Sequence, residues 1–208
     1  MRSFPMKNLI KEIWRKPYQL YLRSSLKNHE FSIISSNCIG GVLSHDLGEQ
    51  FRSPTINLIV EDFLKFARNL KYYIALTPIG EGYDRRGGYP ICKLGDIRLC
   101  GVHYHSHDEM ITAWEKRKKR INWNNIFLIT TDEYINSKEC LEQFDTLPYP
   151  KVVFTKESDN VYDFQVYVPG FENQDHVGDV LRYANILGTR KFEKYFDCIK
   201  WLNSNIVK

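Results

Sequence analysis

The chain has 208 residues, of which 43% are hydrophobic, 14% aromatic and 26% charged. A chain of this length forms one domain with a core that needs no crosslinks, and its composition excludes disordered and fibrous proteins. A net charge of +4 is only mildly basic. This charge permits an anionic partner but does not favour nucleic acid, and we expect no nucleic-acid partner.

The cysteines and the apolar segments indicate the compartment. No apolar run approaches the ~18–20 residues of a membrane span, and the first 30 residues lack the apolar core of a signal peptide. An odd number of cysteines without a C-x-x-C pair is typical of reduced thiols in a cytoplasmic protein. The five are Cys38, Cys92, Cys100, Cys140 and Cys198.

Residues 1–30 are predicted to form a basic amphipathic helical segment, and residues 31–208 a single α/β domain. The segment carries seven Lys and Arg residues against two Glu. The favoured interpretation is a helix that packs on the domain with its basic face in solvent. The alternative is that residues 1–28 lie on anionic lipid through Trp14, Tyr18 and Tyr21, at the inner face of the membrane.

The first half of the domain predicts a strand, a helix and a long loop. Residues 31–36 are a short β-branched run, typical of a buried strand, and the glycine-containing loop 37–41 follows it. Residues 56–73 have apolar side chains at helical spacing behind a Ser-Pro-Thr cap. Residues 77–90 hold four glycines and two prolines, which predicts a loop.

A β-hairpin follows, and its register can be read from the sequence. If Gly95-Asp96 is a two-residue turn, Leu94 faces Ile97 and Cys92 faces Leu99. Cys92 and Cys100 then lie on opposite faces of the hairpin and cannot form a disulfide.

The second half alternates helices with strands. We expect helices from Ser106 to about residue 120, from Ser137 to before Pro148, and over 189–202, where the serines are N-caps. Strands are expected over 125–131, 151–154 and 162–168. The pattern predicts an α/β fold, a three-layer α/β/α sandwich whose sheet is mixed because it includes the hairpin.

Polar residues follow three of the expected strands. They are Asn37-Cys38, His103-Tyr104 and Thr131-Asp132. If these strands are parallel, the polar residues meet at one edge of the sheet, where ligands of open α/β sheets bind.

The sequence also contains the residue types of a cysteine nucleophile and of a metal site, although a simpler explanation is favoured over each. Cys38 with His45 or His103 has the residue types of a nucleophile and its base, but a lone cysteine is more often a buried apolar residue. The stretch His103-Tyr104-His105-Ser106-His107-Asp108 resembles the metal-binding motif of metallo-β-lactamase-fold hydrolases. Histidines at a strand end more often meet solvent, and no metal or cofactor is expected.

A basic run closes the helix that starts at Ser106. Arg117 and Arg120 lie three apart, share a helix face and have the geometry to bind a diphosphate. The simpler explanation is a solvated helix end, where cations are favourable.

A series of motifs in the chain resembles one bacterial family, known as exopolysaccharide biosynthesis proteins and as domain of unknown function nineteen-nineteen. The resemblance covers about residues 31–203, and position 39 departs from it with Ile in place of an aromatic residue. The motifs are Ser36-Asn37-Cys38-Ile39-Gly40-Gly41, His45-Asp46-Leu47-Gly48, Ser53-Pro54-Thr55-Ile56-Asn57-Leu58, Tyr89-Pro90, Lys93-Leu94-Gly95-Asp96, His103-Tyr104, Trp114 with Arg117, Arg120-Ile121-Asn122, Asp145-Thr146-Leu147-Pro148-Tyr149, Val177-Gly178-Asp179, Phe196-Asp197 and Lys200-Trp201-Leu202.

The resemblance implies an α/β/α sandwich and a part in capsule or exopolysaccharide synthesis. The expected activity is that of a transferase using an activated sugar or acyl donor, such as a nucleotide sugar. A non-catalytic module that binds a glycan or a protein partner is the first alternative. A metal-dependent hydrolase built on His103, His105 and His107 is the second.

The expected site combines the resemblance with the polar strand ends. His45 or His103 would be the general base, because imidazole titrates near neutral pH, and Asp46 or Asp132 would orient it. The remaining candidates would bind substrate. They are Asn37, Cys38, Asn57, Tyr104, Arg117, Arg120 and Asn122.

Overall fold

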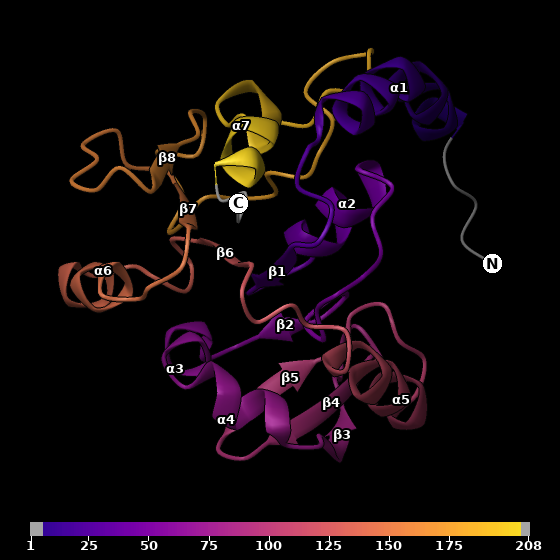
Figure 1. The fold of residues 1–208 in the computed structure, drawn as a ribbon, viewed down its shortest axis with the longest axis vertical. Coiled ribbons are helices and arrows are strands. Elements are labelled where there is room, and N and C mark those ends of the chain that lie inside the picture. The colour runs from indigo at the N-terminus through magenta and orange to yellow at the C-terminus, as the bar shows by residue number, and fades with distance from the viewer. Residues whose placement is uncertain (1–5, 205–208) are drawn as a thin grey trace.

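A computed structural model describes residues 6–204, with side chains from residue 13 onward (Figure 1). The helices are α1 (Met6–Ser25), α2 (Ile39–Asp46), α3 (Phe63–Arg68), α4 (Leu70–Ala75), α5 (His107–Lys118), α6 (Lys138–Asp145) and α7 (Cys198–Asn203), with a 3₁₀ turn at Phe192–Lys194. The strands are β1 (Ser32–Ser35), β2 (Ile59–Val60), β3 (Ile79–Tyr83), β4 (Pro90–Leu94), β5 (Ile97–Cys100), β6 (Ile126–Thr131), β7 (Lys151–Thr155) and β8 (Gln165–Tyr167).

The expected α/β class is confirmed, but the strands form two sheets instead of one mixed sheet. One sheet is parallel, in the order β1-β6-β7-β8, and the other is antiparallel, in the order β2-β5-β4-β3. The two meet where the Val60 N–H donates to the Ser36 carbonyl at 2.9 Å. The hairpin therefore packs against the parallel sheet and does not extend it.

The parallel sheet is a middle layer with a hydrophobic core on each face. Because side chains alternate along a strand, Ile33 faces one core and Ile34 the other. The Ile33 core includes side chains of α1, α2 and α7, which lie on the same side of the sheet (Figure 1). The Ile34 core includes side chains of the antiparallel sheet and of α3 to α6. β6 is consequently buried along its whole length.

The helix expected over 56–73 is wrong in its first part. Residues Ile59–Val60 pair with Leu99–Cys100 as strand β2, so their apolar side chains are covered by sheet pairing. Helix begins only at Phe63, and it is interrupted at Asn69, the boundary residue between α3 and α4. Apolar spacing alone did not distinguish these structures because both bury the same residues.

Two other predicted elements also differ from the structure. The loop expected over 77–90 contains β3, which pairs with β4 through a bulge between Gly80 and Gly82. The helix expected over 189–202 is divided into the 3₁₀ turn and α7. Asp197 starts α7 by accepting the Lys200 N–H at 2.9 Å.

Several local predictions are confirmed. The hairpin has the expected register, with Leu94 opposite Ile97 and Cys92 opposite Leu99. Ser106 and Ser137 cap α5 and α6 through their side chains. All five cysteines are free thiols. Within residues 6–204, no helix combines the length and apolar character needed to cross a membrane.

Candidate functional site

A cavity of about 280 Å³ lies at the carboxyl edge of the parallel sheet, where β1 and β6 end. Ligands of open α/β sheets bind at this edge. Its walls come from the loop after β1, from β2, from the end of β6 and from the segment 176–181. The lining residues are Asn37, Cys38, Ile39, Ile59, Thr131, Glu133, His176, Val177, Gly178, Asp179, Val180 and Leu181.

The wall formed by α2 depends on a turn and a glycine. Asn37 Oδ1 accepts the Ile39 N–H at 3.1 Å, which satisfies one of the free amides at the start of α2. A Cβ on Gly40 would lie 2.7 Å from Ser35 Oγ. Glycine at position 40 therefore lets α2 pack directly on the end of β1.

Asn57, a predicted substrate-binding residue, lies beside the same turn of α2. A Cβ on Gly41 would lie 3.4 Å from Asn57 Oδ1. Asn57 has a φ of 65°. Every other described residue with a positive φ is a glycine. Strained backbone of this kind is common near functional sites.

Asp132 fastens the opposite wall to the sheet. Its Oδ1 accepts the Val177 N–H at 2.7 Å, and its Oδ2 accepts the Lys156 N–H at 2.8 Å. Both oxygens thus bind main-chain amides, whereas the sequence predicted that Asp132 orients a histidine base. Its role is to hold the segment 176–181 over the end of β6.

His176 lines this cavity, and it was not among the site residues predicted from the sequence. Its Nδ1 lies 2.9 Å from the Val177 carbonyl oxygen. A carbonyl only accepts, so we assign the ring proton to Nδ1, and Nε2 of the neutral ring is then a proton acceptor. Glu133 and Asp179 add two carboxylates to the lining. The motif Val177-Gly178-Asp179 was the sequence signal for this segment.

A buried hydroxyl in the cavity wall lacks a hydrogen-bond partner. Thr131 is 3% exposed, and its Oγ1 has no partner among the described residues. Leaving such a group unsatisfied costs about 1–3 kcal/mol. Thr131 is also one of the residues that line the cavity.

Cys38 also lines the cavity, but its environment does not make it a nucleophile. Burial raises the pKa of its thiol to about 11. The protonated thiol is a poor nucleophile, so Cys38 is better described as part of the wall.

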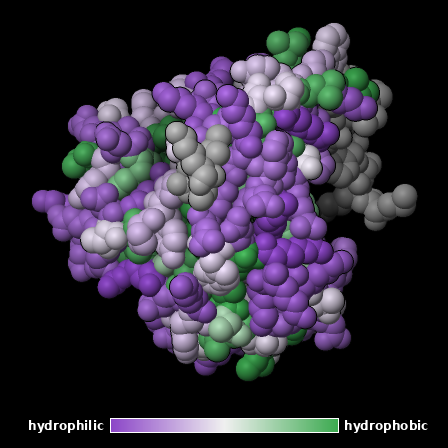
Figure 2. Space-filling view, in the orientation of Figure 1, coloured by the Kyte–Doolittle hydropathy of each residue, from purple (hydrophilic) through white to green (hydrophobic). Residues whose placement is uncertain are grey.

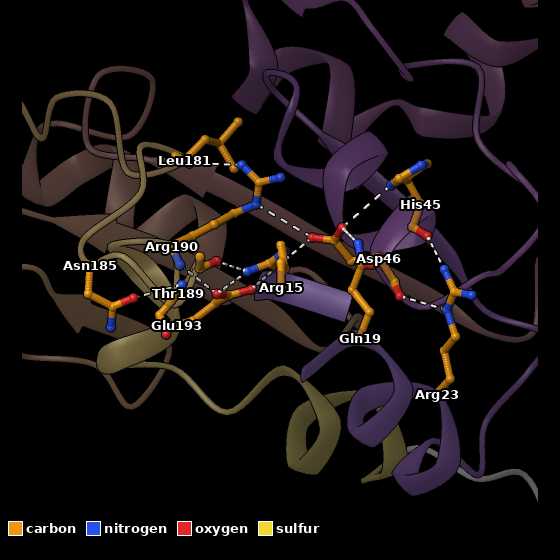
Figure 3. A network of polar contacts seen from close by, with 11 residues as sticks. Arg15, Gln19, Arg23, His45, Asp46, Leu181, Asn185, Thr189, Arg190 and Glu193 are labelled. Carbon is orange, nitrogen blue, oxygen red and sulfur yellow. Dashed lines mark hydrogen bonds and ion pairs between the residues drawn. The ribbon is translucent and has the colours of Figure 1, made fainter. Parts of the chain in front are cut away.

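The predicted base His45 and the carboxylate predicted to orient it, Asp46, do not reach this cavity. They occupy the last turn of α2, an eight-residue helix about 12 Å long whose first turn lines the cavity. The Asp46 carboxylate is buried among Arg15, Gln19 and Arg190, with Arg15 Nη2 at 2.6 Å (Figure 3). The His45 side chain is 72% exposed, and its Nδ1 lies 3.4 Å from Asp46 Oδ1.

The Asp46 carboxylate belongs to a buried ion-pair network that joins α1 to α2 and to the 3₁₀ turn. Arg15 on α1 also binds Glu193 of the 3₁₀ turn. Burial alone would raise the pKa of Asp46, but hydrogen bonding to Arg15 and the charges of Arg15 and Arg190 hold this pKa below its ordinary value. The network is a structural junction between α1, α2 and the C-terminal segment.

Tyr104 and Arg117 contact each other, but neither lines the cavity at the edge of the parallel sheet. The Tyr104 hydroxyl and Arg117 Nη1 each donate to the Ile56 carbonyl at 3.1 Å, and Arg117 also donates to the Tyr104 hydroxyl. Arg117 and Arg120 line a separate hollow of about 580 Å³. The acidic side chains of Asp108 and Glu109 line it too, so it is not a purely cationic phosphate site.

Asn122 lies at the wrong edge of the sheet to join this site. Its Nδ2 donates to the Glu30 carbonyl at 2.8 Å, and its N–H donates to Ser32 Oγ at 2.9 Å. These residues lie at the start of β1 and before β6, whereas Asn37 follows the end of β1. Parallel strands therefore place Asn122 at the edge opposite to the cavity.

The remaining predicted histidines are also away from the cavity. His103 is exposed on the loop between β5 and α5, and it is not among the lining residues. His107 Nε2 donates to the Gly82 carbonyl at 2.7 Å, which joins α5 to β3. Among the side chains that the structure describes, no three His, Cys, Asp or Glu gather as a metal site.

Residues 9–203 match the family model described as Domain of unknown function (DUF1919). The chain belongs to this family. It is similar to an uncharacterized protein of Haemophilus influenzae (strain Rd), with 34% identity over 185 residues that cover 88% of each chain. The match includes all the residues that line the cavity.

Proposed function

We propose that this DUF1919 protein is a transferase of surface-glycan synthesis, and that the cavity at the carboxyl edge of the parallel sheet is its active site. The observation that carries the proposal is that His176 and Thr131 line the same cavity. His176 presents a ring nitrogen assigned as a proton acceptor, and Thr131 presents a buried hydroxyl without a partner. Together they suit a substrate with hydroxyl groups.

The chemistry follows from these groups. The acceptor hydroxyl gives its proton to His176 Nε2, and its oxygen forms a bond to the electrophilic carbon of the activated donor. The bond from that carbon to the leaving group breaks, and the leaving group takes the electron pair. Imidazole is the side chain most often used for this kind of proton transfer. His176 replaces His45 and His103 as the proposed base.

The lining favours a small neutral acceptor. Among the described side chains, no Lys or Arg lines the cavity, whereas Glu133 and Asp179 do. Carboxylates, the Asn37 side chain and the Thr131 hydroxyl are groups that hydrogen-bond sugar hydroxyls. A volume of about 280 Å³ is near the lower end of the range for ligand pockets, so it suits one sugar ring better than an oligosaccharide.

The place in exopolysaccharide synthesis is supported by the family resemblance of the motifs that surround this cavity. The segments Ser36–Gly41 and 177–179 belong to that resemblance and form two of the cavity walls. The donor is an activated sugar or acyl group, because either provides an electrophilic carbon with a leaving group.

Deletion of the gene followed by glycan analysis tests the proposal. Complementation with the wild-type gene should restore the polysaccharide, and complementation with His176→Ala should not. His103→Ala is the matched control, because His103 is exposed and outside the cavity. An unchanged polysaccharide after deletion would overturn the pathway. Full restoration by His176→Ala would overturn the catalytic role of His176 and favour a glycan-binding module.

A further inference from the structure

The helix α1 has an apolar face that no other described part of the chain covers. Ile13, Trp14, Leu20 and Tyr21 are each more than half exposed. Positions 13 and 20, and likewise 14 and 21, are seven residues apart, so all four project from one side of the helix. A face of this kind on the surface of a protein usually marks an interaction site.

The opposite face of α1 is anchored, so the apolar face cannot turn inward. Leu22 and Leu26 are buried in the core on that side of the parallel sheet. Arg15 is buried as well, and it binds Asp46 and Glu193 (Figure 3). Tyr18 packs against the same core, which removes it from the set of exposed aromatic residues that the sequence suggested.

A loop in the C-terminal segment adds two exposed apolar residues next to α1. Ile186 and Leu187 are exposed, and the next residue, Gly188, accepts a hydrogen bond from Arg15 through its carbonyl. The loop tip therefore lies beside α1. We name the combined surface the apolar edge. It consists of Ile13, Trp14, Leu20, Tyr21, Ile186 and Leu187.

The helix α1 and the loop next to it lie on the upper side of the molecule in the view of Figure 1. Figure 2 shows several hydrophobic areas there, over α1 and the loop next to it, with pale and hydrophilic residues between and around them. Four exposed apolar side chains on one side of α1 differ from singly scattered apolar residues, which are normal on a protein surface.

The charge around the apolar edge is positive. Residues 1–30 carry seven Lys and Arg against two Glu, but Arg15 is buried and paired with carboxylates. Among the described side chains of this segment, the cations Lys16, Arg23 and Lys27 are exposed. Cations flanking an apolar helix face that contains Trp and Tyr are typical of helices that lie in the interface of an anionic membrane.

We propose that the apolar edge binds the surface of an anionic lipid bilayer, with α1 parallel to the membrane plane. Trp14 and Tyr21 would lie at the level of the headgroups, and Ile186 and Leu187 would enter the acyl boundary. The basic residues would contact anionic headgroups. The proposal does not depend on the transferase activity, because it uses none of the residues that line the cavity.

Vesicle sedimentation tests this proposal with the full-length chain. The protein is mixed with vesicles of phosphatidylcholine alone, or of phosphatidylcholine with phosphatidylglycerol. Tyr21→Ser is compared with Tyr72→Ser, since the two tyrosines are 60% and 59% exposed. Ile186→Asp is compared with Val161→Asp, since these residues are 76% and 79% exposed and lie in different loops.

The expected result is binding to the anionic vesicles that weakens as salt rises, with little binding to the neutral ones. Tyr21→Ser and Ile186→Asp should each reduce binding roughly tenfold, whereas the two control variants should bind as the wild type does. Equal losses in test and control variants would overturn the proposal. So would a dimer in size-exclusion chromatography that the Tyr21→Ser variant dissociates, because a second copy would then cover this surface.

Discussion

A hydrogen bond of 2.7 Å joins Asp132 Oδ1 to the backbone N–H of Val177, across 45 positions of the sequence. The bond fixes the residue next to His176 to the end of β6. It therefore determines which histidine lies at the carboxyl edge of the parallel sheet. No local pattern in the sequence encodes this contact.

Replacement of Asp132 should loosen the cavity wall. Asp132→Ala removes the acceptors of two main-chain amides, Val177 N–H and Lys156 N–H. The expected loss is about 3 kcal/mol in the free energy of unfolding, because buried donors are left unsatisfied. Urea unfolding measures this loss, and hydrogen exchange of residues 176–181 should become faster. Asp163→Ala, at an exposed position, is the control. Unchanged exchange in the segment 176–181 would show that Asp132 does not hold it.

The ion pair of Arg15 with Asp46 should make the stability of the protein depend on pH. The folded-state pKa of Asp46 is below its ordinary value of 3.8. The stabilisation from this carboxylate is therefore complete above the unfolded pKa, and it is lost as the pH falls below about 4 through the folded pKa.

Arg15→Met should reverse the sign of this dependence. With Arg15 absent, burial dominates and raises the Asp46 pKa, while Glu193 also loses its partner. Unfolding free energies from urea titrations should drop by about 3 kcal/mol at pH 7, and the difference from wild type should shrink at acidic pH. Lys16→Met, a neighbouring exposed cation, should have little effect. A difference that is independent of pH would contradict the role of the pair.

Cys38 should react slowly with alkylating agents. With a pKa of about 11 against an ordinary 9.0, its thiolate fraction at pH 8 is about a hundredfold lower than that of an unperturbed thiol. Iodoacetamide labelling followed by peptide mass spectrometry should show this lag relative to glutathione, and labelling should accelerate as the pH rises. Rapid labelling at pH 7 would indicate an activated thiolate and would revive Cys38 as a nucleophile.

Gly40→Ala should destabilise the fold, although alanine favours helices. The new methyl group would lie 2.7 Å from Ser35 Oγ, so α2 or β1 must shift. Overpacking of this kind costs about 1–3 kcal/mol, measured by thermal or urea unfolding.

The clash predicts a specific coupling between the two residues. In the double variant Ser35→Ala with Gly40→Ala, the hydroxyl that the methyl group would meet is absent. The combined loss should be smaller than the sum of the single losses. Strict additivity would locate the cost of Gly40→Ala elsewhere.

Local features of the fold could be predicted from the sequence because neighbouring residues determine them. The two-residue turn at Gly95-Asp96 and the two-residue period of strands are sufficient for the hairpin register. Ser106 and Ser137 mark helix starts because their side chains bind amides only three residues ahead. The buried character of β6 is likewise evident from its continuous apolar run.

The candidate site depended on contacts between distant residues, and there the sequence was only partly informative. Asn37, Cys38 and the end of β6 were predicted at one edge, because polar residues follow parallel strands. Asn122 was assigned to that edge as well, but it precedes β6 and therefore lies at the opposite one.

What the sequence by itself determined about this protein is its α/β class, its local turns and caps, and the polar edge after β1 and β6. The tertiary structure decided that the hairpin forms a second sheet, that His45 and Asp46 join a buried network, and that His176 lines the cavity. The physical reason is that hairpins and caps are satisfied within a few residues, whereas these three outcomes need partners that only folding brings near. Asp46 finds Arg190, 144 positions away, only in the folded chain.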